Sequence, residues 1–475
     1  MFLQNKSLSI KLILLVALAL LTGFGCKKDT GVLANKLEDV HLTYWQVWQN
    51  SFDIQPIIKK YNQLYPQVKI SFRNLRYEEY EEEMLKALAE DRGPDVFSIP
   101  HDWIGLYKNI IAPQPESVSV KRPIIKQASG TQLEPTIEQI VTDQSTLITA
   151  REIKQEYYPF IKEDILSKEE SANTAGAKKV TERVMALPLN IDALVLYYNK
   201  DILEQSEIFE PPATWENFQT DVIALTKLGP NDEILQAGAA LGAVNNLTRP
   251  TDILVALMMQ TGVQMVDDGG TYTTFHQSIR AEDKYNAGLE ALRFYSDFSD
   301  PAKKVYTWNE KMENAVQVFK QGKLAFLFGY SYSLPEIRAS KINFGVAPIP
   351  TPVIKEGIAR VTVANYWVET VSKKSKNQEY AWHFLNFLSH PENLLDLQAK
   401  TGRLSPRKIH ASELTDLELA VFASQMQDAR VWYHGKDAPT ADKALMDMIS
   451  SVASDTRSLE EALSFGAQLV TQTLR

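Results

Sequence analysis

The chain has 475 residues, with 50 Lys and Arg against 59 Asp and Glu, and a formal net charge of −9. The two signs of charge are interspersed, which argues against the clustered basic surface of a nucleic-acid-binding protein. There is one cysteine, so an intramolecular disulfide is excluded and stability must come from apolar burial. This length is sufficient for two or more hydrophobic cores.

The N-terminal segment has the pattern of a secretion signal. Lys6 and Lys11 precede the apolar run 12–24. The run is shorter than the roughly 20 residues that span a bilayer. A charged start followed by a short apolar run therefore predicts a signal peptide over 1–26.

The single cysteine, Cys26, directly follows this apolar run. A cysteine at this place resembles the lipobox of bacterial lipoproteins, although Gly23 stands where a leucine is usual. We therefore expect lipidation of Cys26 and a polar tether over 27–40. The alternative is a plain signal peptide with an incidental cysteine.

The next region alternates between strand and helix patterns. Strands are predicted over 43–48, 68–72 and 95–99, with helices over 54–65 and 77–89 between them. This order is typical of a parallel sheet with crossover helices. Ligands bind beyond the carboxyl ends of such strands, so the segments that follow the first and third strands are expected to form a cleft wall.

Two further segments differ from this pattern. Residues 112–180 are punctuated by prolines and are expected to form a surface elaboration of the first lobe. Residues 187–198 form an apolar run interrupted by Asp192, which predicts a buried strand. A carboxylate in a buried strand is costly unless it is paired or faces a wet cleft.

The remaining elements follow in order. Helices are predicted over 215–228, 252–262, 281–298, 310–321, 378–388 and 391–401, strands over 322–329 and 344–350, and a helical C-terminal tail.

Six segments together resemble bacterial extracellular solute-binding proteins of ABC importers, the maltose-binding-like class. They occur in the order of that family, which makes the set more specific than any one segment. The segments are GPDVFSIPHDWIGLY (93–107), LPLNIDALVLYYNK (187–200), FKQGKLAFLFGYSYS (319–333), FGVAPIPTP (344–352), NYWVETVSKKSKNQEYAWHFLNFLSHPENL (365–394) and TGRLSPRK (401–408).

The resemblance implies an α/β, two-lobe periplasmic-binding-protein fold of type II-like topology. Mixed sheets flanked by helices would form each lobe, and strands crossing a hinge would connect the lobes. Lobe one is expected over 41–187 and 325–367. Lobe two is expected over 188–324 and 368–475.

The resemblance also implies a carbohydrate bound between the lobes. Aromatic rings would cover the C–H faces of a sugar, and charged or amide groups would bond its hydroxyls. The expected ligand-binding residues are Trp45, Trp48, Asp102, Trp103, Asp192, Asn246, Arg249, Trp308, Tyr330, Tyr332, Tyr366, Trp367 and Arg403.

Several of these residues have a structural alternative. Trp45 can cap the core of lobe one, and Asp102 can cap the helix that follows it. Asp192 can pair with a cation at the hinge, and Trp308 can act as a helix staple. His101 is expected to bond to backbone within its loop rather than to touch ligand.

The predicted function is that of the extracellular substrate-binding component of an ABC importer. It would bind an oligosaccharide without chemistry, close around it, and deliver it to permease subunits. We expect a monomer, exported and lipid-anchored to the outer face of the cytoplasmic membrane, with no cofactor, metal or catalytic residue. The chain has no P-loop, so the ATPase must be another chain.

Three alternatives remain open. The same fold can bind a solute other than a sugar, or can serve as a sensor lipoprotein without transport. A glycoside-active enzyme would need a carboxylate pair, for which Asp102 and Asp192 are the candidates. No nucleophile motif or spaced metal-ligand set supports an enzyme.

Overall fold

The computed structural model describes residues 37–126, 136–172, 178–278, 285–353, 360–408 and 413–475. The predicted signal peptide, Cys26 and most of the predicted tether lie outside these residues. The chain divides into two compact units, one formed by 1–38 and 121–141 and the other by 39–120 and 142–475. The sheets and cavities described below belong to the second unit, except for the strand pair formed by 117–126 and 136–146, part of which belongs to the first.

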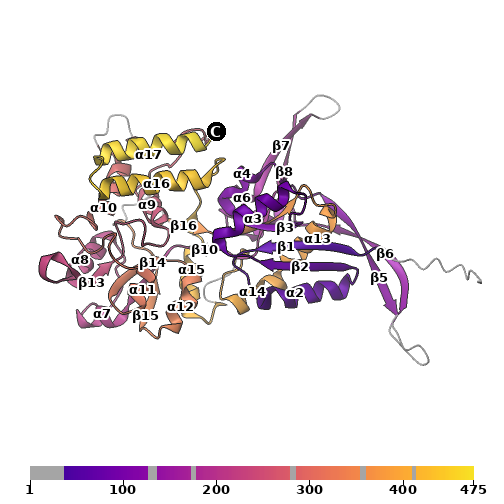
Figure 1. Cartoon of the computed structure of the whole chain (residues 1–475), viewed down its shortest axis with the longest axis horizontal. Coiled ribbons are helices and arrows are strands. Elements are labelled where there is room, and N and C mark those ends of the chain that lie inside the picture. The colour runs from indigo at the N-terminus through magenta and orange to yellow at the C-terminus, as the bar shows by residue number, and fades with distance from the viewer. Residues whose placement is uncertain (1–36, 127–135, 173–177, 279–284, 354–359, 409–412) are drawn as a thin grey trace, which may run out of the picture. The chain divides into compact units, whose positions relative to one another are not determined.

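The first sheet contains six strands. Its strands β1, β2 and β3 are those that the alternation of strands and helices predicts (Figure 1). β1 pairs in parallel with β2 and β3, whereas β17 pairs antiparallel with β3, β4 and β9. The sheet order is β2 (Val68–Asn74), β1 (Val40–Gln46), β3 (Val96–Pro100), β17 (Trp367–Ser372) and β4 (Ile111–Ala112), with β9 (Leu187–Pro188) also on β17.

Local sequence features explain why the helices that accompany this sheet form, as α2 illustrates. In α2 (Ser51–Leu64), buried Ile54, Ile57, Ile58 and Tyr61 recur at helical spacing, and the Asn50 side chain accepts a hydrogen bond from the Asp53 amide (3.1 Å). The other helices on this side are α3 (Tyr77–Ala89), α4 (Ile104–Tyr107), α13 (Gln378–Leu388) and α14 (Pro391–Thr401), with the 3-10 turn η1 (His101–Trp103) after β3.

The second sheet has five strands around the segment predicted as one buried strand. That apolar run, 187–198, instead forms three short strands in three sheets. The run is buried except at Asn190 and Tyr198, which are partly buried, so its hydrophobicity does not reveal where it passes from one sheet to the next. The sheet order is β12 (Lys227–Leu228), β13 (Ile234–Ala239), β14 (Leu324–Gly329), β11 (Val195–Asn199) and β15 (Phe344–Ala347).

The strand pairing differs from the expected lobe boundaries. β14 and β15 flank β11, so 324–347 belongs to the second sheet and not to the first. The chain returns to the first sheet only at β17, and α13 and α14 then pack on that side against α2. Motif order cannot reveal this, because it does not say which strands form hydrogen bonds to each other.

A small three-stranded sheet connects the two larger ones. It contains β10 (Asp192–Ala193), β16 (Thr362–Asn365) and β18 (Ala429–Arg430). Asp192 lies opposite Asn365, and the Ile191 amide donates to the Leu404 carbonyl (3.0 Å). Three segments that cross between the sheets therefore lie side by side.

The C-terminal helices pack with the second sheet. Helices α9, α10, α16 and α17 contact one another, and their apolar residues join the core cluster of that sheet. The helices on this side are α7 (Lys200–Gln205), α8 (Trp215–Leu225), α9 (Pro250–Gln260), α10 (Ala287–Asp297), α11 (Ala315–Lys320), α12 (Leu334–Ala339), α15 (Leu417–Gln425), α16 (Ala438–Ala453) and α17 (Leu459–Thr473), with the 3-10 turns η2 (Pro230–Asp232) and η3 (Ser331–Ser333). Within the described residues, none of the helices has the length and apolar character needed to cross a bilayer.

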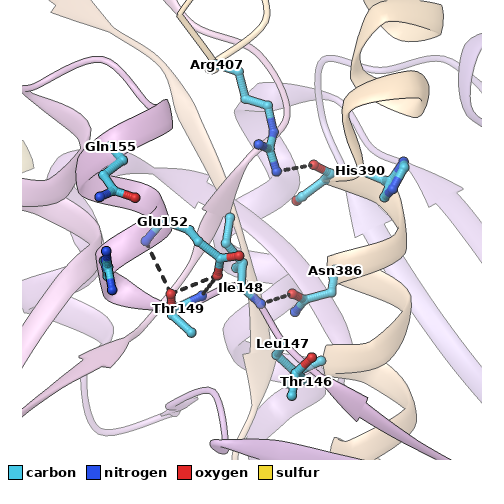
Figure 2. Close-up of a pocket in the computed structure, with 11 residues that line it drawn as sticks. Thr146, Leu147, Ile148, Thr149, Glu152, Gln155, Asn386, His390 and Arg407 are labelled. Atoms are coloured by element: carbon cyan, nitrogen blue, oxygen red, sulfur yellow. Dashed lines mark hydrogen bonds between the residues drawn. The ribbon is translucent and has the colours of Figure 1, made fainter.

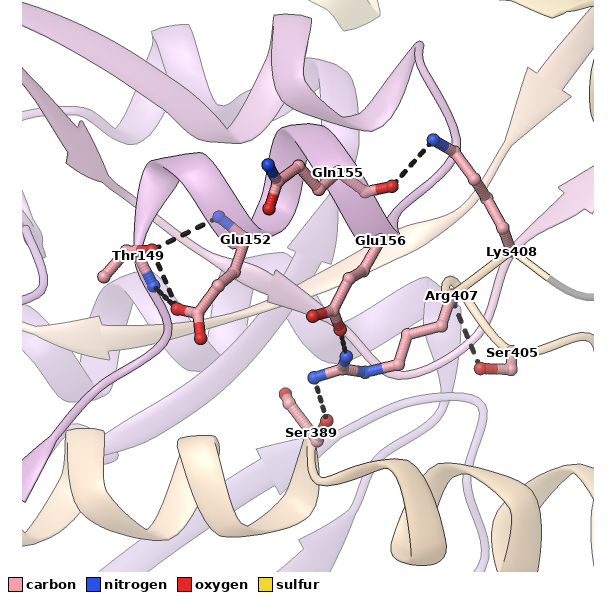
Figure 3. Close-up of polar contacts among 8 residues, drawn as sticks. All are labelled: Thr149, Glu152, Gln155, Glu156, Ser389, Ser405, Arg407 and Lys408. Atoms are coloured by element: carbon pink, nitrogen blue, oxygen red, sulfur yellow. Dashed lines mark hydrogen bonds and ion pairs between the residues drawn. The ribbon is translucent and has the colours of Figure 1, made fainter.

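The proline-rich segment before the crossing contains two strand pairs and two helices. These are β5 (Ser117–Lys126) with β6 (Thr136–Thr146), β7 (Leu166–Ala172) with β8 (Lys178–Val184), α5 (Ala150–Glu156) and α6 (Ile161–Ile165). Glu156 pairs with Arg407, and Lys408 Nζ donates to the Gln155 carbonyl (2.9 Å; Figure 3). The segment is thus attached to one of the crossing segments.

A buried carboxyl in β17 predicts a pH-dependent stability. Glu369 is 1% exposed and accepts hydrogen bonds from Ser98 Oγ (2.5 Å) and Gln46 Nε2 (3.0 Å). Burial raises its pKa to about 7 despite these bonds. The folded protein then binds a proton more tightly than the unfolded chain. The resulting stability is complete below the unfolded pKa of about 4.3 and is lost as pH rises through about 7.

We therefore expect Glu369→Gln to flatten the decrease in unfolding free energy between pH 5 and pH 8. The unfolding free energies of Glu369→Gln and the parent protein should differ at pH 8 by about 1–3 kcal/mol more than they differ at pH 5. Urea titrations at several pH values measure it. The exposed Glu82→Gln on α3 is the control, and equal slopes in the parent and Glu369→Gln would contradict the prediction.

Candidate ligand-binding site

A cavity of about 490 Å³ lies where segments of both large sheets and the crossing strands meet. The segments that follow β1 and β3 contribute to it, as expected for the carboxyl ends of strands. Its lining residues are Trp48, Tyr77, Pro100, His101, Asp102, Trp103, Asn190, Asp192, Thr248, Arg249, Tyr332, Asn365, Tyr366, Trp367, Arg403, Ala438, Pro439, Asp442 and Met446.

Aromatic rings form one wall of the cavity. Trp48 follows β1, and its ring stacks on Tyr332 of η3, with centroids 6.3 Å apart and planes inclined by 16°. The ring of Trp367 lies edge-on to that of Trp48, with centroids 6.0 Å apart. The centroid of the Tyr77 ring is 5.8 Å from that of Trp48. Rings from both sides of the cavity therefore contact one another and offer flat apolar area.

Two charged lining groups lack a partner within the described part of the chain. The Asp102 carboxylate makes no hydrogen bond or ion pair there, and no side-chain cap is found at the N-terminus of α4. The Arg403 guanidinium is likewise without a bonded acceptor in those residues. Burial raises the pKa of Asp102 and lowers that of Arg403. Both groups have bonding capacity that a ligand could use.

Asp192, in contrast, is satisfied by the protein. Its Oδ2 accepts from the Ser331 amide (2.8 Å) and hydroxyl (2.7 Å), and its Oδ1 accepts from the Ala193 amide (2.9 Å). Burial raises its pKa to about 7, while these bonds and the charge of Arg403 oppose the increase. The carboxyl therefore connects β10 to η3 as well as lining the cavity.

Arg249 is held in a fixed orientation beside the cavity. It has a left-handed backbone (φ 52°) at the start of α9. Its Nε and one terminal nitrogen donate to the two oxygens of Asp252 (2.9 and 3.0 Å), and its other terminal nitrogen lies 3.8 Å from Asp442. A bidentate pair of this kind fixes the plane of the guanidinium.

Four residues expected to bind ligand lie outside the cavity lining. Trp308 is fully buried and its Nε1 donates to Asn246 Oδ1 (2.9 Å), so these two residues satisfy each other. Tyr330 is also fully buried and donates to Asp252 (2.5 Å). Trp45 lies under the guanidinium of Arg73, 4.8 Å from its ring centroid. The aromatic or amide character of these residues serves packing.

Sequence analysis missed several lining residues. Asn190 and Asn365 lie at the crossing strands, Asp442 on α16, and Tyr77 at the start of α3. Asn365 directly precedes Tyr366 and Asn190 lies two residues before Asp192, so their positions in the motifs could have indicated them. Asp442 and Tyr77 reach the cavity only through tertiary packing.

His101 also differs from expectation. Its backbone amide donates to the Tyr366 carbonyl (3.1 Å), but its ring lines the cavity and its Nδ1 lies 2.9 Å from the Asp164 carboxylate. The ring stacks on Tyr366 with centroids 4.4 Å apart.

A second cavity, of about 630 Å³, lies beside α5 and the junction of α13 and α14 (Figure 2). Asn386 accepts a hydrogen bond from the Ile148 amide (2.7 Å), and Arg407 donates to the Ser389 carbonyl (3.5 Å). Its lining contains no Trp, Tyr or Phe, so it lacks the flat apolar area of the first cavity. In the described residues no group of three or more His, Cys, Asp or Glu could hold a metal ion.

The family can be stated from a sequence comparison. The model of the bacterial extracellular solute-binding proteins matches residues 50–394. The chain belongs to this family, and the resemblance noted in the sequence is confirmed.

Individual relatives are more distant. A protein of Brucella abortus named as a binding protein is 26% identical over 52% of this chain and 57% of its own length. The maltodextrin-binding protein of Bacillus subtilis is 27% identical over 45% of this chain and 48% of its own length. The chain thus spans about half the length of these curated relatives.

A solved structure supports the fold. The solute-binding protein of an ABC transporter from Thermotoga lettingae, bound with α-D-tagatose, superimposes with a TM-score of 0.66. It is 17% identical, and the match covers 92% of this chain and 100% of that one. The expected periplasmic-binding-protein fold is confirmed.

Proposed function

We propose that this protein is the substrate-binding component of an ABC importer, and that it binds a carbohydrate in the 490 Å³ cavity. The observation that carries the proposal is the combination of an aromatic wall with two charged groups, Asp102 and Arg403, that have no bonded partner among the residues the structure describes. Sugars offer hydroxyls to such groups and C–H faces to such rings. The volume lies within the range of small-molecule sites.

The names of the relatives support this ligand class. The Bacillus subtilis relative is a maltodextrin-binding protein, and the Thermotoga lettingae structure contains a ketohexose. The two lobes would close around the ligand by bending at the crossing strands. The ligand would be released unchanged to permease subunits, in keeping with relatives that are named as binding proteins.

The site proposal comprises the predicted residues that line the cavity. Arg249 and Asp192 would act as oriented polar contacts, the aromatic residues as apolar surfaces, and Asp102 and Arg403 as a hydrogen-bond acceptor and donor. The proposed ligand-binding residues are Trp48, Asp102, Trp103, Asp192, Arg249, Tyr332, Tyr366, Trp367 and Arg403. We further propose a monomer that is exported and held at the outer face of the membrane through lipid on Cys26.

A thermal-shift screen against mono- and oligosaccharides tests the function. A ligand that binds only the folded protein raises the melting temperature, and the rise increases with ligand concentration. At a ligand concentration of 100 times Kd, the free energy of unfolding increases by about 2.7 kcal/mol. The screen should include amino acids, polyamines and inorganic phosphate as non-sugar controls. Stabilisation by a non-sugar alone would contradict the carbohydrate assignment, and mass spectrometry of the recovered ligand checks that it is unaltered.

A further inference from the structure

One buried carboxylate beside the cavity has no role in the function proposed above. Asp164 lies on α6, in the segment predicted to be a surface elaboration, and its side chain is 1% exposed. Its Oδ2 lies 2.9 Å from His101 Nδ1 and accepts a hydrogen bond from the Tyr366 hydroxyl. Its Oδ1 lies 3.1 Å from His434 Nδ1.

The first two partners belong to the ligand cavity. His101 and Tyr366 both line it, and their rings are nearly parallel, with 9° between the planes. Asp164 therefore fixes the orientation of two lining side chains that are stacked on each other.

The third partner comes from the other side of the molecule. His434 lies between β18 and α16, in a stretch attached to the end of α17. The Tyr433 hydroxyl and the Lys436 amide both donate to the Thr473 carbonyl (2.9 and 2.8 Å). Helix α6 contacts η1, which follows β3 of the first sheet, whereas Tyr433 shares a hydrophobic cluster with α16 and α17. The contact between Asp164 and His434 thus connects the side of the first sheet to the C-terminal helices.

A glycine on α4 allows this close approach. A Cβ atom on Gly105 of α4 would lie 2.1 Å from the Gly435 carbonyl oxygen. Gly435 is adjacent to His434, so a side chain at Gly105 would push His434 away from Asp164. The backbone of α4 at Gly105 and the backbone at Gly435 therefore lie too close together for a side chain at Gly105.

We propose that Asp164 is a positioning residue of the ligand site that couples closure of the lobes to uptake of a proton by His434, so that ligand affinity increases in mildly acidic medium. The proposal rests on the proposed binding function. His101 and Asp164 lie on the same side, so their contact persists when the lobes separate. The contact with His434 is lost on opening.

The charges around the cluster favour a protonated imidazole. Burial opposes the charge on His434, but Asp164 outweighs it and raises the pKa of His434 above its ordinary value, with Glu163 adding to the increase and His101 opposing it. The pKa of His101 is raised in the same way by Asp164 and by Asp102, against burial.

The remaining neighbours are consistent with this direction. Arg249 disfavours the charge on His101, and Tyr366 keeps its proton because burial and Asp164 raise its pKa. Burial alone would raise the pKa of Asp164, yet the two histidines hold it well below its usual range. Asp164 is therefore ionised at every pH considered.

The direction of the pH dependence follows from these contacts. The closed state binds more protons than the open state, so affinity is highest below the ordinary histidine pKa of about 6.5 and falls as pH rises through the raised value. One proton limits the decline to about tenfold per pH unit. The side chain of His434 is already 41% exposed beside Asp164, and separation of the lobes would remove the carboxylate that raises its pKa.

Calorimetry with the sugar identified by the screen tests the coupling. Titrations at one pH in buffers of different ionisation enthalpy give the number of protons taken up on binding. We expect uptake of up to one proton for the parent protein, and its loss in His434→Gln and Asp164→Asn. The control is His41→Gln, at an exposed position on β1, which should keep the uptake. Unchanged uptake in His434→Gln, or none in the parent protein, would overturn the proposal.

A second measurement separates this proposal from the proposed function. Histidine titrations followed by NMR in the ligand-free protein should show a raised midpoint for His101, because its contact with Asp164 persists in the open state. Asp164→Asn should lower that midpoint. If no sugar binds, the proposed function fails, whereas a His101 midpoint that does not change in Asp164→Asn would overturn the role of Asp164 with any ligand.

Discussion

Replacing Asp102 with Asn should weaken ligand binding about 10- to 100-fold. The carboxylate lines the cavity without a partner in the described residues, so its bonding capacity is available to a ligand hydroxyl. A hydrogen bond to a charged group contributes about 1.5–3 kcal/mol, which corresponds to that range of Kd. Asn keeps the shape of the side chain and removes the charge.

The same substitution should leave the fold intact. Burial raises the pKa of Asp102, which means that its charge is disfavoured in the empty site. Removing the charge should therefore maintain or increase the melting temperature without ligand. Isothermal titration with the identified ligand measures the affinity, and Asp447→Asn on the exposed face of α16 is the matched control. Equal affinities for Asp102→Asn and the parent protein would exclude Asp102 from the site.

Replacing Trp308 with Ala should lower the free energy of unfolding by about 3–5 kcal/mol. The indole is fully buried, and its Nε1 donates to Asn246 Oδ1 (2.9 Å). Asn246 in turn donates from Nδ2 to the carbonyls of Asn309 (2.8 Å) and Met312 (3.0 Å). The substitution leaves a large cavity and an unpaired amide oxygen.

This result would distinguish a core residue from a ligand contact. The folded fraction of Trp308→Ala should bind ligand with nearly the parent affinity, since the ring does not line the cavity. Urea denaturation gives the stability, and calorimetry below the transition gives the affinity. Trp308→Phe is the companion variant, because it keeps most of the volume and loses only the N–H donor. A large loss of affinity at small loss of stability would restore the sequence-based assignment.

The sequence predicted the fold because its main signals are local. Strand and helix patterns in the first region match β1, α2, β2, α3 and β3 closely. Six motifs in family order predicted the two-sheet architecture, which the structural comparison confirms. The lobe boundaries were less accessible, since β14 and β15 join the second sheet through hydrogen bonds with β11 that no local pattern encodes.

The residues predicted for the candidate site fall into two groups, those that line the cavity and those that do not. Residues just after strands, such as Trp48 and Asp102, were predicted to reach the cleft, and both line the cavity. Trp308 and Tyr330 were predicted from residue type and motif, yet both are fully buried with protein partners. An aromatic residue that packs a core and one that covers a sugar have the same appearance in a sequence.

The cluster around Asp164 could not have been predicted. Asp164, Tyr366 and His434 are far apart in the chain and come from three different segments. Only the fold places His101 and His434 on opposite oxygens of one carboxylate. The segment 112–180, predicted to be a surface elaboration, thereby contributes a buried carboxylate next to the cavity.

The pairing of β10 with β16, together with the bridge from Ile191 to Leu404, has a mechanical consequence. A single flexible linker would permit twisting, sliding and tilting in any direction. Three chain segments fastened edge to edge resist torsion, because rotation would shear their hydrogen bonds. Flexing about the line across this ribbon costs least. The two halves would then bend about a single axis and return to the same alignment after every cycle of opening and closing.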